Sequence, residues 1–358
     1  MQDWPRGWHA LAGIETLPER LRRLGYRTGL FGKYHLGETA TPGAGWDDWV
    51  TMEHGHVRSF YANGIIDNGR QYEQPGHSVD FFTDKAVDFI GRQTGPYFAF
   101  VPFPAPYGHW PATNDGNRNR FSAHYDRIKA QSGGGLDFSM LMRAPNDLAT
   151  LRNYFSQITL IDDAVGRIMA ADPDALIIYT ADHGLSLGQH GFWGHGAATW
   201  PSNMHRAAHS VPLIVRAPGA LLGAPVGVSV DRQVSNMDLH ATILDLLGDE
   251  PDPARPSRSF APLLRGSLSP GPDPDEVFAE QEETRVIRTP RWAYFKRFRG
   301  PGADFGDALF DLSADPDETR NLAQDPAHAG VVADLSARID TYFARYADPR
   351  ADLWHGGR

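Results

Sequence analysis

The 358-residue sequence contains no cysteine. Disulfide bridges and thiolate metal sites are therefore excluded. The sequence also has no apolar run that approaches the roughly 20 residues required by a membrane-spanning helix. Its opening residues lack the apolar core that is typical of a signal peptide. We accordingly expect no membrane among the partners of this protein.

Positively charged side chains are fewer than negatively charged ones. The chain has 34 lysine and arginine residues against 44 aspartate and glutamate residues, for a formal net charge of -10. Binding to nucleic acid requires clustered lysine and arginine side chains that displace the counterions of the phosphates. We therefore expect no nucleic-acid partner, and a small anionic substrate would need a local positive pocket.

The remaining composition is typical of a globular protein. Hydrophobic residues make up 41% of the chain and charged residues 22%. A chain of this length can bury a large core and usually forms one large domain with a smaller one. Residues 249–274 are dense in proline, serine and arginine, which indicates a linker or a surface crossing. We therefore predict a main domain at residues 1–248 and a C-terminal subdomain at residues 249–358.

Strand-like apolar runs and helix-like segments alternate through the predicted main domain. Short apolar runs suited to buried strands are separated by segments whose apolar residues recur at the helical period. This alternation predicts an α/β fold with a large, mainly parallel sheet between helices. The predicted strands are residues 26–31, 97–101, 175–180 and 211–215, and the predicted helices are residues 15–24, 78–90, 147–170 and 238–247.

The C-terminal subdomain has a different pattern. Four short β-like runs, at residues 277–280, 284–288, 292–298 and 309–312, precede a helical segment at residues 331–346. Because consecutive short strands without intervening helices usually pair with their neighbours, this pattern predicts a small antiparallel sheet. We expect the final helix to pack against that sheet.

Polar residues follow several of the predicted strands closely. In open α/β sheets, ligands bind beyond the carboxyl ends of the strands. A carboxylate and imidazoles that converge there with a lysine could hold a divalent cation and an oxyanion. The candidate residues are Lys33, His35, His109, Asp182, His183 and His195.

Four stretches carry a resemblance to a known family. Residues 25–37, GYRTGLFGKYHLG, are similar to the sulfatase signature G-Y-x-T-x-x-x-G-K-W-H-L-G. Residues 180–184, TADHG, resemble the family's T-S-D-H-G segment, and residues 211–219 resemble its later core strand. Residues 309–322 resemble its C-terminal pattern L-Y-D-L-x-x-D-P-x-E-x-x-N-L. The chain is therefore similar to the sulfatase family of the alkaline phosphatase superfamily over nearly its whole length.

The resemblance implies an alkaline-phosphatase-like fold and a pocket for a sulfate group. It implies that Lys33 holds sulfate oxygens and that His35 acts as a base on a hydrated formylglycine nucleophile. It also implies that His109 binds sulfate and helps to protonate the leaving oxygen. These roles are expectations carried over from the matching motif positions.

The resemblance also implies a metal site. Asp182 and His183 would contribute ligands to Ca²⁺ or another divalent cation, with His183 at a position where many relatives have asparagine. His195 occupies the position where relatives usually have a second active-site lysine. Because lysine is charged at neutral pH whereas histidine need not be, the role of that lysine does not transfer directly to His195.

The nucleophile of the family has no counterpart in this sequence. Family members begin with a buried strand that ends in paired aspartates, followed by C-x-P-S-R or S-x-P-S-R, whose first residue is oxidised to formylglycine. Neither feature occurs before Lys33. We therefore expect that an N-terminal segment is missing, together with the nucleophile, its formylglycine and the first central strand of the sheet.

Three look-alike segments do not supply the absent chemistry. The aspartate pair at residues 47–48 follows no predicted strand. The pair at residues 162–163 lies within a predicted helix, where neighbouring side chains point to different faces. Residues 254–258, ARPSR, end like the nucleophile motif, but alanine occupies the reactive position.

The resemblance, without its nucleophile segment, leaves three functions open. The first is hydrolysis of a small-molecule sulfate ester, either an aryl sulfate or a sugar sulfate. The second is hydrolysis of a phosphonate or a phosphate diester, because the superfamily shares one metal and oxyanion scaffold. The third is an inactive fragment that binds an anion or nothing at all.

Overall fold

The computed structural model describes residues 9–43, 45–55, 59–107, 118–127, 148–196, 199, 201–218, 227–267, 275–298 and 305–347. The chain forms two compact units, of which the first contains the described residues up to Ile177 and the second those from Ile178 onward. The division at residue 249 into a main domain and a C-terminal subdomain stays a prediction. Among the helices in the described ranges, none is both long enough and apolar enough to span a bilayer.

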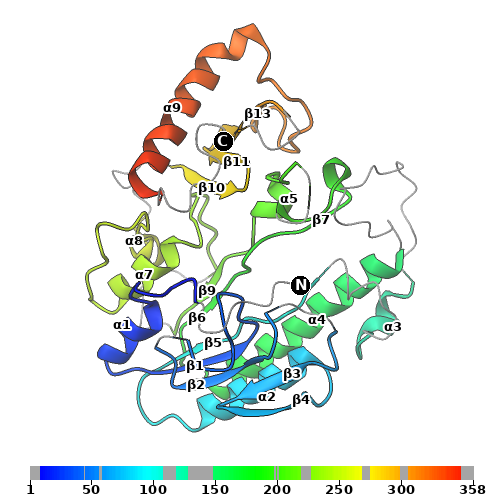
Figure 1. The fold of residues 1–358 in the computed structure, drawn as a ribbon, viewed down its shortest axis with the longest axis vertical. Helices are drawn as coiled ribbons and strands as arrows, with labels where there is room; N and C mark the ends of the chain where they lie inside the picture. The colour runs from blue at the N-terminus through cyan, green and yellow to red at the C-terminus, as the bar shows by residue number, and fades with distance from the viewer. Residues whose placement is uncertain are drawn as a thin grey trace. The chain divides into compact units, whose positions relative to one another are not determined.

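A five-stranded mixed sheet is the centre of the first unit (Figure 1), with the strand order β4-β3-β2-β1-β5. β1 runs parallel to β2 and β5, whereas β3 pairs antiparallel with β2 and β4. The sheet confirms the strands predicted at residues 26–31 and 97–101, which are β1 and β5. The strands are β1 (Arg27–Gly32), β2 (Asp48–Met52), β3 (Gly64–Asp67), β4 (Arg70–Glu73) and β5 (Tyr97–Phe100).

β2, β3 and β4 are not among the strands predicted from the sequence. β2 is buried at every position, but it begins with aspartate and contains threonine, so it shows no continuous apolar run. β4 is mostly exposed and largely polar. Two of the four pairings in the sheet are antiparallel because β3 and β4 form a hairpin that extends the sheet beyond β2.

The helices predicted in the first unit are confirmed. The Thr16 side chain caps the first helix, and Glu19 completes a reciprocal capping box with it. α2 packs against α4 and against the sheet, where the Phe89 ring lies 5.2 Å from the Phe31 ring of β1. The helices are α1 (Leu17–Arg23), α2 (Ser78–Gly91), α3 (Ser122–Tyr125) and α4 (Leu148–Ala171).

Short elements make up the first part of the second unit. β6 pairs with β9, and β7 forms a two-residue antiparallel hairpin with β8. β6 confirms the strand predicted at residues 175–180, and α7 confirms the helix predicted at residues 238–247. β9 begins only at Ile214, so it overlaps the strand predicted at residues 211–215 at its end alone. The elements are β6 (Ile177–Tyr179), β7 (Ser186–Leu187), η2 (Gln189–Gly191), β8 (Trp193–Gly194), α5 (Arg206–His209), β9 (Ile214–Arg216), α7 (Asp238–Leu246) and α8 (Ala261–Leu264).

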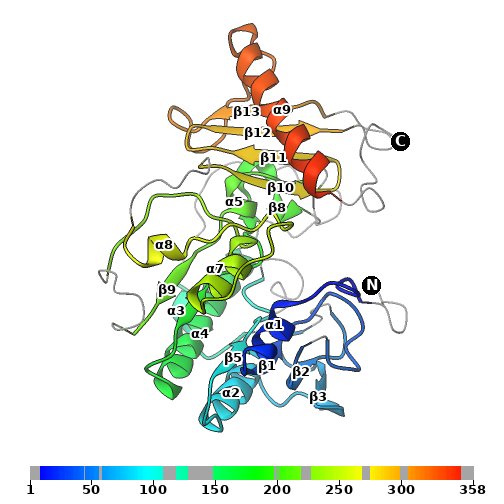
Figure 2. The same ribbon diagram turned by 90° about the vertical axis from the view of Figure 1, so that its left-hand side faces the viewer.

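A four-stranded antiparallel sheet with one helix forms the C-terminal part of the second unit, as predicted. Figure 2 shows α9 lying across one face of this sheet. Leu335, Ile339 and Phe343 recur every four residues along α9 and pack on Ile287 and Tyr294. Each such buried apolar side chain contributes about 1.5–3 kcal/mol. The elements are β10 (Val277–Gln281), β11 (Thr284–Arg288), β12 (Trp292–Arg297), β13 (Ala308–Asp311), η4 (Pro326–His328) and α9 (Ala329–Tyr346).

β5 and β6 are less buried than their apolar sequences predict. No residue of either strand is fully buried, and Phe100 of β5 is 47% exposed. The Trp46 ring stacks on Phe98 and Phe100 and covers part of β5. The predicted loss of a central strand stays a prediction.

Candidate active site

Lys33 lies immediately after β1, where the backbone makes a close approach to another segment. The Lys33 N–H donates to the Pro102 carbonyl oxygen over 2.8 Å. Gly32 has a φ of 153°, and a Cβ atom there would lie 2.1 Å from that same oxygen. The glycine before the lysine is therefore required by sterics, which explains the G-K pair in the motif.

His35 follows on the same segment and is half-buried. Tyr34 anchors the segment between the two candidates, because its ring packs edge-on against Trp49 at 4.9 Å within a buried cluster. Gly55 lies against the His35 ring, since a Cβ atom at residue 55 would come within 2.3 Å of His35 Cδ2. The first unit thus fixes the backbone that carries Lys33 and His35.

His109 lies outside the described residues. Its predicted role in sulfate binding and leaving-group protonation stays a prediction. The segment that leads toward it contains a cis peptide bond between Ala105 and Pro106. The Tyr107 N–H donates to the Gln157 side chain of α4 over 2.8 Å.

Asp182 and His183 lie just beyond the end of β6, as predicted. The Asp182 carboxylate accepts a hydrogen bond of 2.9 Å from the His183 N–H, and its other oxygen lies 3.7 Å from His183 Nε2. His183 Nδ1 lies 2.8 Å from the Gly184 carbonyl oxygen, which can only accept. Nδ1 therefore carries a proton, and Nε2 is the ring nitrogen that faces Asp182.

Gly184 explains the last position of the D-H-G motif. Its N–H donates to the Ala208 carbonyl oxygen over 2.8 Å. A Cβ atom at residue 184 would lie 2.3 Å from the Ala207 carbonyl oxygen, so α5 leaves no room for a side chain. The motif is therefore held in place by its contact with α5.

His195 joins Asp182 and His183 in one cluster. It follows β8, and its ring stacks on the His183 ring at a centroid distance of 3.9 Å with an interplanar angle of 26°. The first unit thus presents Lys33 and His35 on one segment, and the second unit presents Asp182, His183 and His195 together.

The Asp182–His183 pair fits part of a divalent-cation site. The Asp182 side chain is 76% exposed, so its oxygens are accessible. Ca²⁺ prefers about six to eight oxygen ligands, whereas an imidazole nitrogen suits transition metals. The pair offers one of each ligand type, and its nitrogen favours a transition metal over calcium.

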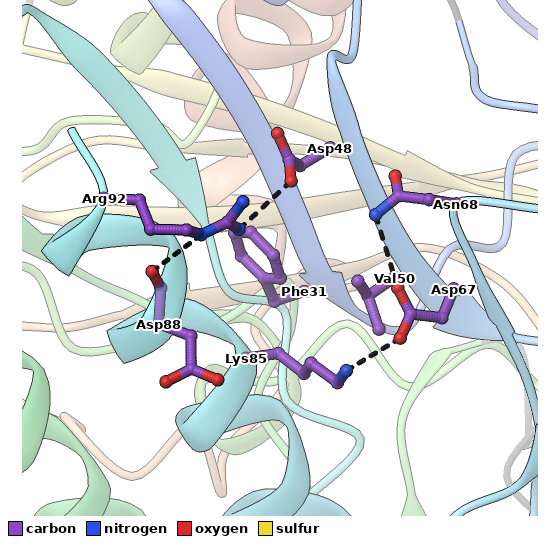
Figure 3. Close-up of a pocket in the computed structure, with 8 residues that line it drawn as sticks. All are labelled: Phe31, Asp48, Val50, Asp67, Asn68, Lys85, Asp88 and Arg92. Carbon is purple, nitrogen blue, oxygen red and sulfur yellow. Dashed lines mark hydrogen bonds and ion pairs between the residues drawn. The ribbon is translucent and has the colours of Figure 1, made fainter.

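The aspartate pair at residues 47–48 is structural. Asp48 begins β2 and bonds Arg27 at 3.0 Å and Arg92 at 3.3 Å, while Asp47 accepts a hydrogen bond from the Thr28 N–H. Asp48 and Arg92 line a cavity of about 300 Å³, and Figure 3 shows the contact between the two side chains. Lys85 on the same wall bonds Asp67 at 2.7 Å. Contacts with arginine side chains and backbone groups therefore account for the Asp47 and Asp48 carboxylates without a metal ion.

Three other histidines of the second unit are not among the predicted site residues. From His183 to His209, both included, the chain contains five histidines, three of which are His190, His205 and His209. Burial lowers the pKa of His209 to about 4, and the charge of Arg288 adds to this effect. This density of histidines is the feature of the sequence that could have indicated a second polar cluster.

The chain matches a known family over most of its length. The sequence model of the family described as Sulfatase matches residues 4–249. A choline-sulfatase of Rhizobium meliloti is 30% identical over 214 residues, which cover 57% of this chain and 37% of that relative. The matching stretch thus spans well under two thirds of that relative's length.

Solved structures share the fold. A protein in complex with its substrate D-glucosamine-2-N,6-O-disulfate superposes with a TM-score of 0.77 at 20% identity, over 95% of this chain and 84% of that chain. The phosphonate monoester hydrolase of Agrobacterium radiobacter superposes with a TM-score of 0.65 at 22% identity, over 94% and 81%. These likenesses establish an α/β fold with a mixed sheet and a C-terminal antiparallel sheet.

Proposed function

The chain belongs to the sulfatase family of the alkaline phosphatase superfamily, and from this premise we propose that its site residues bind and activate the sulfate group of a small sulfate ester. The observation that carries the proposal is the cluster of Asp182, His183 and His195 beyond the end of β6. A carboxylate and two imidazoles at the carboxyl end of a strand suit a divalent cation and an oxyanion.

The proposed reaction breaks the bond between sulfur and the ester oxygen. Water supplies the oxygen that ends on sulfur, and the alcohol leaves with a proton. Lys33 supplies positive charge to the sulfate oxygens, His35 holds or takes a proton at the nucleophile, and His109 gives a proton to the leaving oxygen. These roles rest on the motif positions of the three residues.

A divalent cation held by Asp182 and His183 would supply further positive charge beside the sulfate oxygens. Ca²⁺ is the ion that the family resemblance implies. The nitrogen ligand from His183 supports Mn²⁺ or Zn²⁺ as an alternative. Titration of the purified chain with each ion separates these possibilities.

We propose a sugar sulfate or an aryl sulfate as the substrate. The structural neighbour bound to a glucosamine disulfate supports a sugar sulfate. The phosphonate monoester hydrolase among the neighbours supports a second candidate, hydrolysis of a phosphonate or phosphate diester at the same site. An inactive fragment is the third candidate, because no C-x-P-S-R or S-x-P-S-R motif occurs among the 358 residues.

A paired assay tests the proposal. The substrates are 4-nitrophenyl sulfate and 4-nitrophenyl phenylphosphonate, and the enzyme is a form of this chain that carries the family's nucleophile segment. We expect faster turnover of the sulfate and a loss of at least about tenfold in kcat/KM for Asp182→Asn. Faster turnover of the phosphonate would favour the second candidate, and an unchanged rate in the variant would contradict the assigned site.

The 358-residue chain alone provides a second test. Because it contains neither a C-x-P-S-R nor an S-x-P-S-R motif, we expect no turnover of either ester by this polypeptide. Robust metal-dependent hydrolysis by the purified chain would show that another residue serves as nucleophile.

A further inference from the structure

A buried carboxylate in the second unit anchors a second histidine cluster. Glu318 is 1% exposed and follows β13, while His205 immediately precedes α5. His205 Nδ1 lies 3.0 Å from Glu318 Oε2, and the Arg206 N–H donates to the same oxygen over 3.0 Å. The two segments are 113 residues apart in the sequence, so only the fold brings these groups together.

Arg288 fixes the charge of this carboxylate. Its guanidinium donates to Glu318 Oε1 and, over 2.9 Å, to the Met204 carbonyl oxygen. Burial alone would raise the pKa of Glu318, but hydrogen bonds from His205 and Arg288 outweigh it and lower the pKa to about 2. Glu318 is therefore ionised at neutral pH, and three of its roughly four lone-pair positions accept hydrogen bonds.

His190 completes the cluster from an exposed turn. Its ring stacks on the His205 ring at a centroid distance of 3.7 Å and an interplanar angle of 9°. It lies in η2, in the turn of the β7–β8 hairpin, with a φ of 56°. Partial burial lowers the pKa of His190, and the neighbouring His205 lowers it further. A neutral imidazole with a free lone pair is therefore favoured at neutral pH.

We propose that His190, His205 and Glu318 form a binding site for a transition-metal dication such as Zn²⁺, separate from the site at Asp182 and His183. One nitrogen or oxygen atom from each of the three side chains lies within 4.8 Å of the other two. In a tetrahedral zinc site with bonds of about 2.1 Å, neighbouring ligand atoms lie about 3.4 Å apart. The His205–Glu318 pair, now 3.0 Å apart, must therefore open slightly, and any longer separation must close.

The ion takes the place of the hydrogen between His205 Nδ1 and Glu318 Oε2. The displaced proton moves to His205 Nε2 or, when that nitrogen already carries one, to water. The stacked His190 ring must turn to direct a nitrogen at the ion, and its position on an exposed hairpin turn permits this movement. Water completes the coordination on the exposed side.

Arg288 beside Glu318 and two aromatic rings beside His205 shape the properties of this site. The positive charge of Arg288 opposes a dication, so we expect weaker binding than in a structural zinc site. Phe295 and Phe310 flank the His205 ring at 5.3 and 5.4 Å and restrict its movement. His190 is therefore the ligand that responds to the ion.

Zinc titration of the tag-free chain tests the proposal. Asp182→Ala is the background, because it removes the carboxylate of the other metal site. In this background we expect binding of one Zn²⁺ by calorimetry, and we expect His190→Asn to weaken it at least tenfold. Asparagine tolerates the left-handed backbone at residue 190, so the variant removes the imidazole without new strain.

His124→Asn is the matched control, because His124 is also exposed but lies in α3 of the first unit. It should leave zinc binding unchanged. Visible absorption of bound Co²⁺ provides a second measurement, whose bands should disappear with His190→Asn. The proposal fails if the Asp182→Ala chain binds no zinc, or if His190→Asn binds it as tightly. Neither result bears on sulfate hydrolysis, which rests on Asp182 and His183.

Discussion

The second unit contains two stacked histidine pairs whose carboxylates differ sharply in environment. Asp182, beside His183 and His195, has a side chain that is 76% exposed. Glu318, beside His190 and His205, has a side chain that is 0% exposed and is bound by Arg288. The exposed carboxylate is available to a ligand, whereas the buried one is first a structural anchor. Similar residue types therefore serve different purposes according to burial.

The strongest test of this comparison replaces the buried carboxylate. In Glu318→Gln, Arg288 keeps its charge in a buried position without an anionic partner. Breaking a buried ion pair in this way costs about 3–5 kcal/mol. We expect a loss of this size in the free energy of unfolding, measured with denaturant and followed by circular dichroism.

Asp182→Asn is the matched change at the exposed carboxylate. Surface substitutions without buried partners usually change stability by less than about 0.5 kcal/mol. Equal losses in the two variants would show that burial does not separate the two pairs.

The pH dependence of stability provides the next test. The pKa of Glu318 is about 2 in the fold against 4.5 for an ordinary glutamate, so the unfolded chain binds a proton at a higher pH than the folded chain. The stabilisation is therefore complete above about pH 4.5 and is lost as the pH falls toward 2. Its size is about 3 kcal/mol on the scale of 1.36 kcal/mol per pKa unit.

Denaturant unfolding at pH 6, 4 and 3 measures this contribution. The difference in unfolding free energy between the original chain and Glu318→Gln should shrink as the pH falls. A difference that stays constant would contradict an ionised carboxylate at residue 318.

The relative affinity for Mn²⁺ and Ca²⁺ tests the proposed metal site at Asp182 and His183. In His183→Asn, an amide oxygen replaces the imidazole nitrogen beside Asp182. Oxygen ligands suit Ca²⁺ and nitrogen ligands suit transition metals. We expect the ratio of Mn²⁺ to Ca²⁺ affinity, measured by calorimetry, to fall about tenfold, which corresponds to about 1.4 kcal/mol. His124→Asn should leave the ratio unchanged, and an unchanged ratio in His183→Asn would argue against His183 as a ligand.

Local sequence patterns predicted much of the fold and placed Lys33 and Asp182 just beyond the ends of strands. Lys33 and Asp182 could be found because each closely follows an apolar run that forms a strand. The Glu318 anchor could not be found in this way, because its partners His205 and Arg288 lie 113 and 30 residues away. β2 was missed for a related reason, since Asp48 is buried only because Arg27 and Arg92 bind it. Periodicity reports local burial, whereas these contacts depend on the fold.

The smallest expected effect concerns His195, at the position where relatives usually have lysine. His195→Lys would place a permanent positive charge beside His183, whose ring now stacks on His195 at 3.9 Å. If this position faces the sulfate group, the added charge should tighten binding of inorganic sulfate by a few fold, measured by calorimetry at low ionic strength. The gain should shrink in about 1 M salt, where the screening length falls to about 3 Å. His190→Lys, a matched change on the other histidine pair, should leave sulfate affinity unchanged. If both variants tighten binding equally, the effect reflects net charge, and His195 has no specific place beside the anion.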